Sequence, residues 1–250
     1  MLARVVILMA MLSIACTADA CNPRDFHGIY GFQLNGTTTI GSQPQPVVSV
    51  GRLDFDGTGG VSGVISLSFT GLYLGNPATG MYDSHEDCSM TWSLQDVSGN
   101  YQHFEGTLSE DAGNARFHQT DPGAPSQGTL VKAADACQDR DFQPSYHFTI
   151  SGKQIDVNNA QVAGSVSVRG SMERQGSQLT LKIEGDSSAA SSGTVQVDGD
   201  CFVHLDLMLA LGSGDPVEVK FRGLLVKGGA ELIGMATDPG SALSLRLTAP

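Results

Sequence analysis

The stretch Cys21-Asn22-Pro23-Arg24-Asp25-Phe26 decides the fold, because it returns later as Cys137-Gln138-Asp139-Arg140-Asp141-Phe142. A second stretch, Thr120-Asp121-Pro122-Gly123, likewise returns as Thr237-Asp238-Pro239-Gly240. The chain is therefore one unit written twice. This duplication predicts two domains, residues 21–133 and 134–250, with no long linker between them.

The cysteines follow the duplication, with Cys21 and Cys88 in the first unit and Cys137 and Cys201 in the second. Four cysteines allow three pairings, and only Cys21–Cys88 with Cys137–Cys201 gives both copies the same bond. No Cys-x-x-Cys or Cys/His cluster has zinc spacing. We expect two disulfides, each able to stabilise its unit by up to roughly 4 kcal/mol.

The N-terminus reads as an export signal. A basic residue and an apolar run, Val5–Ala15, precede Ala18-Asp19-Ala20, which has the small-x-small form that a signal peptidase cuts. The run is too short to span a bilayer, and no later segment reaches about 18 apolar residues. We expect residues 1–20 to be a cleaved signal peptide and the mature protein to be secreted or periplasmic. The alternative is a lipobox, Ser13-Ile14-Ala15-Cys16, which would leave Cys16 as a lipid-modified N-terminus.

The charge balance excludes two classes of partner. The chain has 14 Lys and Arg against 26 Asp and Glu, a net charge of −12. The leader carries one residue of each sign, Arg4 and Asp19, so cleavage leaves this charge unchanged. Nucleic acids and anionic membranes are bound through basic surfaces, and neither is an expected partner.

An apolar alternation of period two runs through both units and indicates half-buried strands. Runs bounded by turn residues predict eight strands in each unit. In the first unit they lie near 26–35, 46–56, 60–70, 79–86, 88–96, 101–109, 113–120 and 127–132. In the second they lie near 142–151, 161–169, 178–185, 192–198, 201–211, 216–226, 229–236 and 241–248. Short hairpin connections favour a barrel over a sandwich. The predicted fold is all-β: two tandem eight-stranded antiparallel β-barrels with one disulfide each.

Several short motifs have structural interpretations. Asp56-Gly57-Thr58-Gly59-Gly60 and Asp121-Pro122-Gly123 are interpreted as tight turns. Asn35-Gly36-Thr37 matches a glycosylation sequon, but it is interpreted as another hairpin turn. Arg24-Asp25 and Arg140-Asp141 are each expected to form an ion pair at a barrel end, with a ligand clamp as the alternative.

The duplication also tests candidate chemistry, because no histidine of one unit aligns with a histidine of the other. A general base or metal ligand basic to the fold is expected in both copies. The best remaining cluster is His85-Glu86-Asp87-Cys88, a solvated strand end or, alternatively, a weak metal site. We therefore predict no catalytic, cofactor-binding or metal-binding residues.

Three motifs carry a resemblance to a known family: Tyr30-Gly31-Phe32, the turn within Val50–Gly59, and Gly80-Met81-Tyr82 followed by Asp87-Cys88-Ser89. Together they resemble uncharacterised secreted bacterial proteins, common in acidobacteria. The resemblance covers most of residues 21–133 and implies no known activity. More distantly, the pattern is similar to calycin-type and allene-oxide-cyclase-like barrels, an analogy of fold alone.

Three functions are compatible with paired barrels that share no catalytic residue. The leading hypothesis is a non-catalytic extracytoplasmic protein that binds a small apolar ligand or has a role at the cell surface. One alternative is an isomerase or cyclase that acts on a lipid-like substrate inside one barrel. The other is an adhesion or envelope-structural module. An open pocket in either barrel would separate these hypotheses.

Overall fold

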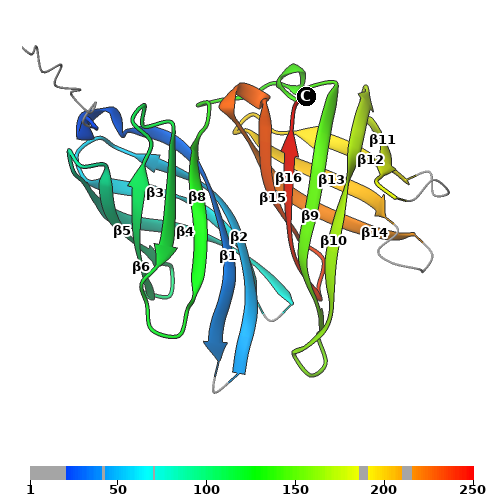
Figure 1. Ribbon diagram of the computed structural model, residues 1–250, viewed down its shortest axis with the longest axis horizontal. Coiled ribbons are helices and arrows are strands. Elements are labelled where there is room, and N and C mark those ends of the chain that lie inside the picture. Colours follow the sequence, from blue (N-terminus) through cyan, green and yellow to red (C-terminus); the bar gives the residue numbers. More distant parts are fainter. Residues whose placement is uncertain (1–20, 41–42, 70, 186–190, 210–215) are drawn as a thin grey trace, which may run out of the picture.

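The computed structural model describes residues 21–40, 43–69, 71–185, 191–209 and 216–250. The chain forms two closed antiparallel barrels of eight strands each, side by side (Figure 1). The predicted fold class is confirmed. The expected signal peptide, with Ala18-Asp19-Ala20 and Cys16, lies outside the described residues. No helix in the described part of the chain is long and apolar enough to cross a membrane.

The first barrel runs in simple up-and-down order and closes by pairing β8 with β1. Its strands are β1 (Gly28–Ile40), β2 (Gln43–Phe55), β3 (Gly60–Phe69), β4 (Leu72–Ser84), β5 (Ser89–Asp96), β6 (Tyr101–Leu108), β7 (Asn114–Gln119) and β8 (Ser126–Lys132).

The second barrel repeats this order and closes by pairing β16 with β9. Its strands are β9 (Ser145–Asp156), β10 (Gln161–Gln175), β11 (Gln178–Ile183), β12 (Ser191–Val197), β13 (Phe202–Leu209), β14 (Val217–Val226), β15 (Glu231–Ala236) and β16 (Ser241–Thr248). Short 3-10 turns η1 (Pro23–Asp25), η2 (Asp139–Asp141) and η3 (Lys227–Gly229) complete the described elements.

One predicted turn is wrong. Asn35-Gly36-Thr37 lies inside β1, which continues to Ile40 and pairs with β2 along its whole length. Gly36 is needed there for close packing rather than for turning, because a Cβ on it would lie 2.4 Å from Ser126 Cα in β8.

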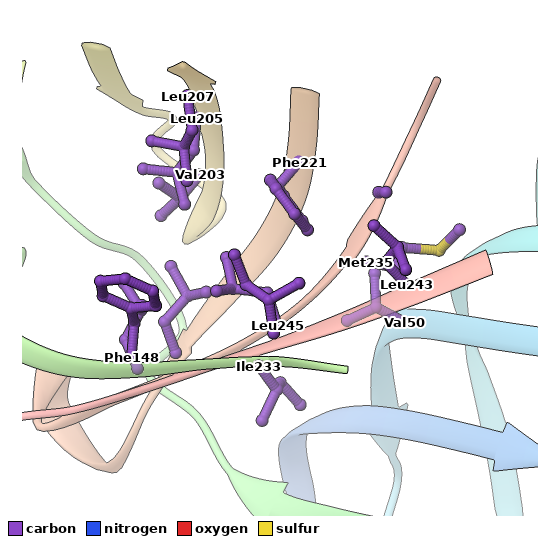
Figure 2. Close-up of a cluster of buried hydrophobic side chains, with 14 of the residues drawn as sticks. Val50, Phe148, Val203, Leu205, Leu207, Phe221, Ile233, Met235, Leu243 and Leu245 are labelled. Carbon is purple, nitrogen blue, oxygen red and sulfur yellow. The ribbon is translucent and has the colours of Figure 1, made fainter. Parts of the chain in front are cut away.

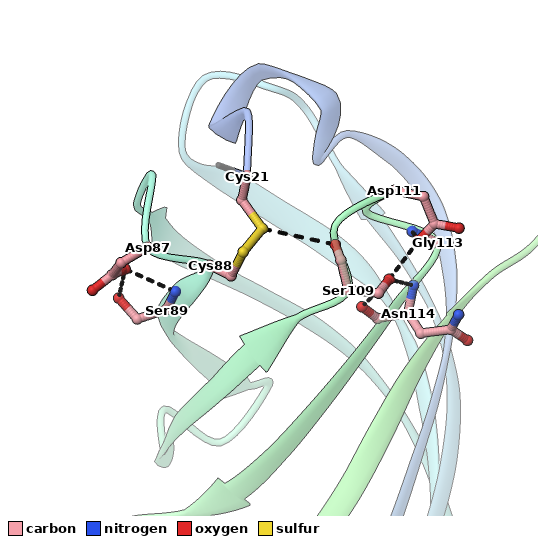
Figure 3. The surroundings of a disulfide bond; sticks show 8 residues. All are labelled: Cys21, Asp87, Cys88, Ser89, Ser109, Asp111, Gly113 and Asn114. Carbon is pink, nitrogen blue, oxygen red and sulfur yellow. Dashed lines mark hydrogen bonds between the residues drawn. A yellow bond between two sulfur atoms is a disulfide. The ribbon is translucent and has the colours of Figure 1, made fainter. Parts of the chain in front are cut away.

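Each barrel has the predicted disulfide, Cys21–Cys88 in the first and Cys137–Cys201 in the second. The second cysteine of each pair has a left-handed backbone conformation, with φ of 67° at Cys88 and 69° at Cys201. The preceding aspartate supports this turn, since Asp87 Oδ1 accepts hydrogen bonds from the N–H and hydroxyl of Ser89 (Figure 3). Asp200 takes the same place in the second barrel, where its Oδ1 accepts a hydrogen bond from the N–H of Phe202, so the Asp-Cys dipeptide is a shared structural device.

The Arg-Asp dipeptides after the first cysteines form the two 3-10 turns η1 and η2. Asp25 Oδ1 accepts a hydrogen bond from Asn22 Nδ2, and Asp141 Oδ2 accepts one from the N–H of Gln138. These carboxylates stabilise the entry to each barrel. The expected ion pairs are wrong, because neither Arg24 nor Arg140 has an ion pair with any described residue.

A buried tyrosine also repeats, although the sequence comparison did not single it out. Tyr30 donates to the carbonyl of Ala112 and Tyr146 to that of Gly229, each at 2.6 Å. Both acceptors lie in the turn before the seventh strand of their barrel. Each tyrosine therefore links the first strand of its barrel, through a hydrogen bond on the inner side, to the turn at one barrel end.

The barrels dock through faces that are not equivalent. The outer side of β1 and β2 in the first barrel packs against β14, β15 and β16 of the second. Val48 and Val50 belong to the hydrophobic core cluster of the second barrel, and Figure 2 shows Val50 beside Met235 and Leu243. Gln33 reaches across and donates to the carbonyls of Gly234 and Leu245, at 3.1 and 3.3 Å. The two barrels form one continuous packed body.

Candidate functional site

The interiors of the barrels are filled by side chains. In the first barrel, Phe32, Trp92, Phe104 and Phe117 pack ring against ring. A pocket at its open end, lined by Ile65, Leu67, Ala78 and Leu94 among others, holds about 70 Å³. Small-molecule sites usually hold about 300–1,000 Å³. This pocket is smaller than the room that a lipid-like substrate inside the first barrel would need.

The six histidines lie on the outer surface, and four of them pair with carboxylates. His103 Nδ1 is 2.8 Å from Asp121 Oδ1, and His204 Nε2 is 3.1 Å from Asp198 Oδ2. His85 Nε2 is 3.7 Å from Asp83 Oδ2. These are exposed surface pairs of the kind that contributes little to stability.

The predicted cluster at His85–Cys88 does not converge on one point. Hydrogen bonds from Ser89 hold the Asp87 carboxylate and keep the pKa of Asp87 below its usual value. Among the described residues, no three His, Cys, Asp or Glu side chains are placed to hold a metal ion.

A groove of about 510 Å³ lies between the two barrels. Its floor is the outer face of β6, β7 and β8, and its opposite wall comes from η3 and β16. Strand register places Thr107, Arg116 and Thr129 in one row across the floor. The wall contributes Lys227 and Arg246. The groove thus gathers three cationic side chains on a chain of net charge −12.

Glu231 organises the two cations of the wall. Its carboxylate accepts hydrogen bonds from Lys227 Nζ and from Arg246 Nη2, each at 2.6 Å. Burial alone would raise the pKa of Glu231, but these hydrogen bonds outweigh it and the pKa lies below its usual 4.5. Glu231 is therefore ionised near neutral pH, and it fixes the positions of both cations while cancelling one of their charges.

Arg116 adds a second uncompensated charge to the groove. Its guanidinium forms no hydrogen bond or ion pair with any other described residue. Arginine presents a planar fork of donors that matches carboxylate and phosphate. Arg116 on the floor of the groove thus faces Lys227 and Arg246, which Glu231 already holds in position.

Comparison of the two copies could have found this site. Repeat alignment places Arg116 opposite Ile233, and Thr129 opposite Arg246. Ile233 is fully buried in the barrel–barrel contact, whereas Arg116 is exposed. The same outward position is thus apolar in the second copy and cationic in the first. Such a difference indicates a face that is docked in one copy and exposed to solvent in the other. A comparison of the histidines alone does not reveal this exchange.

A second, shallower depression of about 720 Å³ lies on the outer face of the first barrel. It includes Met81, Asp83, His103 and Glu105. It opens broadly to solvent, and its histidine is already paired with Asp121. This surface offers less to a ligand than the groove.

No family model and no curated protein matches the chain. Membership of the secreted bacterial family therefore stays a prediction. Among solved structures, the isotype 1 transferrin binding protein B of serogroup B Neisseria meningitidis matches 90% of this chain and 75% of its own. Its TM-score is 0.34 at 7% sequence identity. The Myxococcus xanthus hemagglutinin, solved with a mannopentaose, matches 87% and 99% with a TM-score of 0.17 at 12% identity. We draw no functional conclusion from either likeness.

Proposed function

We propose that the chain is an exported, non-catalytic binding protein that holds a small anion in the groove between its barrels. The observation that carries this proposal is the free guanidinium of Arg116 facing Lys227 and Arg246. A groove of about 510 Å³ is within the size range of small-molecule sites. Carboxylate and phosphate are the anions that an arginine fork binds best.

The extracytoplasmic setting is supported by two features. Disulfides persist in oxidising compartments, and both barrels contain one. Residues 1–20 have the form of a cleaved signal peptide, with Cys16 as the alternative lipid-modified terminus. A cleaved signal peptide predicts a secreted or periplasmic protein. A lipid-modified Cys16 predicts a protein anchored to a membrane.

A binding role is favoured over the other functions considered above. A cyclase or isomerase acting inside a barrel needs room that the packed interior of the first barrel does not offer. An adhesion or envelope-structural module would not need three cations collected in one groove.

The test is a calorimetric titration of the full mature protein with phosphate, citrate and galacturonate. We expect at least one anion to bind and Arg116→Ala to weaken that binding by about tenfold or more, the loss of a charge-assisted contact. Arg140→Ala is the matched control, because Arg140 is an exposed arginine outside the groove. Absence of binding, or equal affinity in Arg116→Ala, would overturn the proposal. Chemical change in the recovered anion would overturn its non-catalytic part.

A further inference from the structure

We propose that the ligand of the groove is an acidic saccharide, with its carboxylate at Arg116 and its hydroxyls along β8 and β1. This inference rests on the proposed function and specifies the chemistry of the ligand. It arises from the part of the groove that lies beyond the cations.

The groove continues past Arg116 into a second hollow of about 280 Å³. The two hollows share Arg116, Thr129 and Arg246, so they are contiguous. Strand register places Gln127 beside Asn35 in the row next to that of Arg116 and Thr129. From Val131 to Gln127 the floor extends roughly 13 Å along β8. A single carboxylate or phosphate would occupy only one end of such a groove.

The extension is lined by side chains that both donate and accept hydrogen bonds. Asn35, Gln127 and Thr129 form no side-chain hydrogen bond with any other described residue. An amide supplies two donors and an acceptor, and a hydroxyl supplies both roles in one group. Sugar hydroxyls need this same mixture. The cations at one end and the amides at the other therefore match a molecule with a carboxylate and many hydroxyls.

An acidic peptide fits the groove less well. Extended peptides commonly bind by adding a strand to an open sheet edge. Both barrels are closed, so the floor strands β6, β7 and β8 are paired on each side. The backbone polar groups of a peptide would find no unpaired strand, and recognition would fall on side chains alone.

The experiment compares galacturonate, digalacturonate, the neutral disaccharide maltose and a short polyglutamate by calorimetric titration into the mature protein. We expect digalacturonate to bind about tenfold more tightly than galacturonate, the gain from one or two added hydrogen bonds. Maltose should not bind measurably. A double variant, Asn35→Ala with Gln127→Ala, should remove the advantage of the disaccharide over the monosaccharide, whereas Arg116→Ala should weaken the binding of both.

The outcomes separate this inference from the proposed function. Binding of galacturonate through Arg116 without a gain for digalacturonate would overturn the saccharide assignment and leave the anion site standing. Tighter binding of polyglutamate than of digalacturonate would also overturn it. No binding of any anion would overturn both proposals. Retained near-ultraviolet circular dichroism in the double variant shows that its losses do not come from unfolding.

Discussion

Single exchanges between equivalent positions explain why one barrel docks and the other keeps a binding face. Arg116 and Thr129 of the first copy correspond to Ile233 and Arg246 of the second. Ile233 is buried against the first barrel, where a Cβ on Gly31 would lie 2.9 Å from its Cδ1. Burying an unpaired charge is costly, so an arginine is compatible only with the copy whose face stays open. The residue at the position of Arg116 and Ile233 therefore assigns each face its role.

At this scale the structure predicts a pH effect centred on Glu231. Its pKa is depressed in the folded protein, so its stabilising effect is present above the unfolded pKa, near 4.5, and is lost as the pH falls through the folded value. Glu231→Gln should lower the free energy of unfolding by about 1–2 kcal/mol at pH 7. The deficit should shrink as the pH falls through the folded-state pKa of Glu231. Denaturant unfolding at a series of pH values measures it, and a deficit independent of pH would contradict this role.

Whole hairpins, rather than single side chains, set the contact between the barrels. The ribbon of β1 and β2 lies with its outer side on β14 and β15. Gly31 sits at the closest approach, where an added Cβ would meet Val226 Cγ1 at 2.6 Å. In the second copy the same place is taken by His147, which is exposed.

This contact predicts that Gly31→Val is destabilising. The added side chain must push β1 away from β14 and β15, at a cost of about 1–3 kcal/mol for overpacking. The matched substitution His147→Val changes the equivalent strand position where nothing packs on it, and its effect should be within about 0.5 kcal/mol. Denaturant midpoints of the two variants provide the comparison. Equal midpoints would show that the hairpin contact is looser than the structure has it.

The number and positions of the strands could be predicted from the sequence because each strand has one apolar face. Trp92 and Leu205 each belong to an alternating run that enters a barrel core, and eight strands per unit were predicted and found. The long β1–β2 hairpin was misjudged at Asn35-Gly36-Thr37, because glycine serves close packing as well as turning. The groove was not predicted, since it depends on which outer faces meet, and alternation within one barrel carries no information on that.

At the scale of the molecule, two barrels of the same strand order dock asymmetrically. Because the two docked faces are not equivalent, each barrel keeps one free face. These two free faces are the counterparts of the docked pair, an arrangement that risks open-ended assembly of further copies. The free counterpart of the docking face carries Arg116 and His118 where the second barrel has Ile233 and Met235. These polar residues disfavour the docking of a further copy of the chain. They line or border the groove instead. The site therefore belongs to neither barrel alone.

The most direct test of this account is the affinity for galacturonate of an Ile233→Arg variant, which places the first copy's residue in the docking face of the second. An arginine buried at this contact should separate the barrels, and small-angle scattering should show a larger radius of gyration. The single tryptophan, Trp92, reports independently that the first barrel stays folded. We predict that separation lowers the affinity by at least about tenfold, because Lys227 and Arg246 leave Arg116. Unchanged affinity in separated barrels would contradict a binding site built between them.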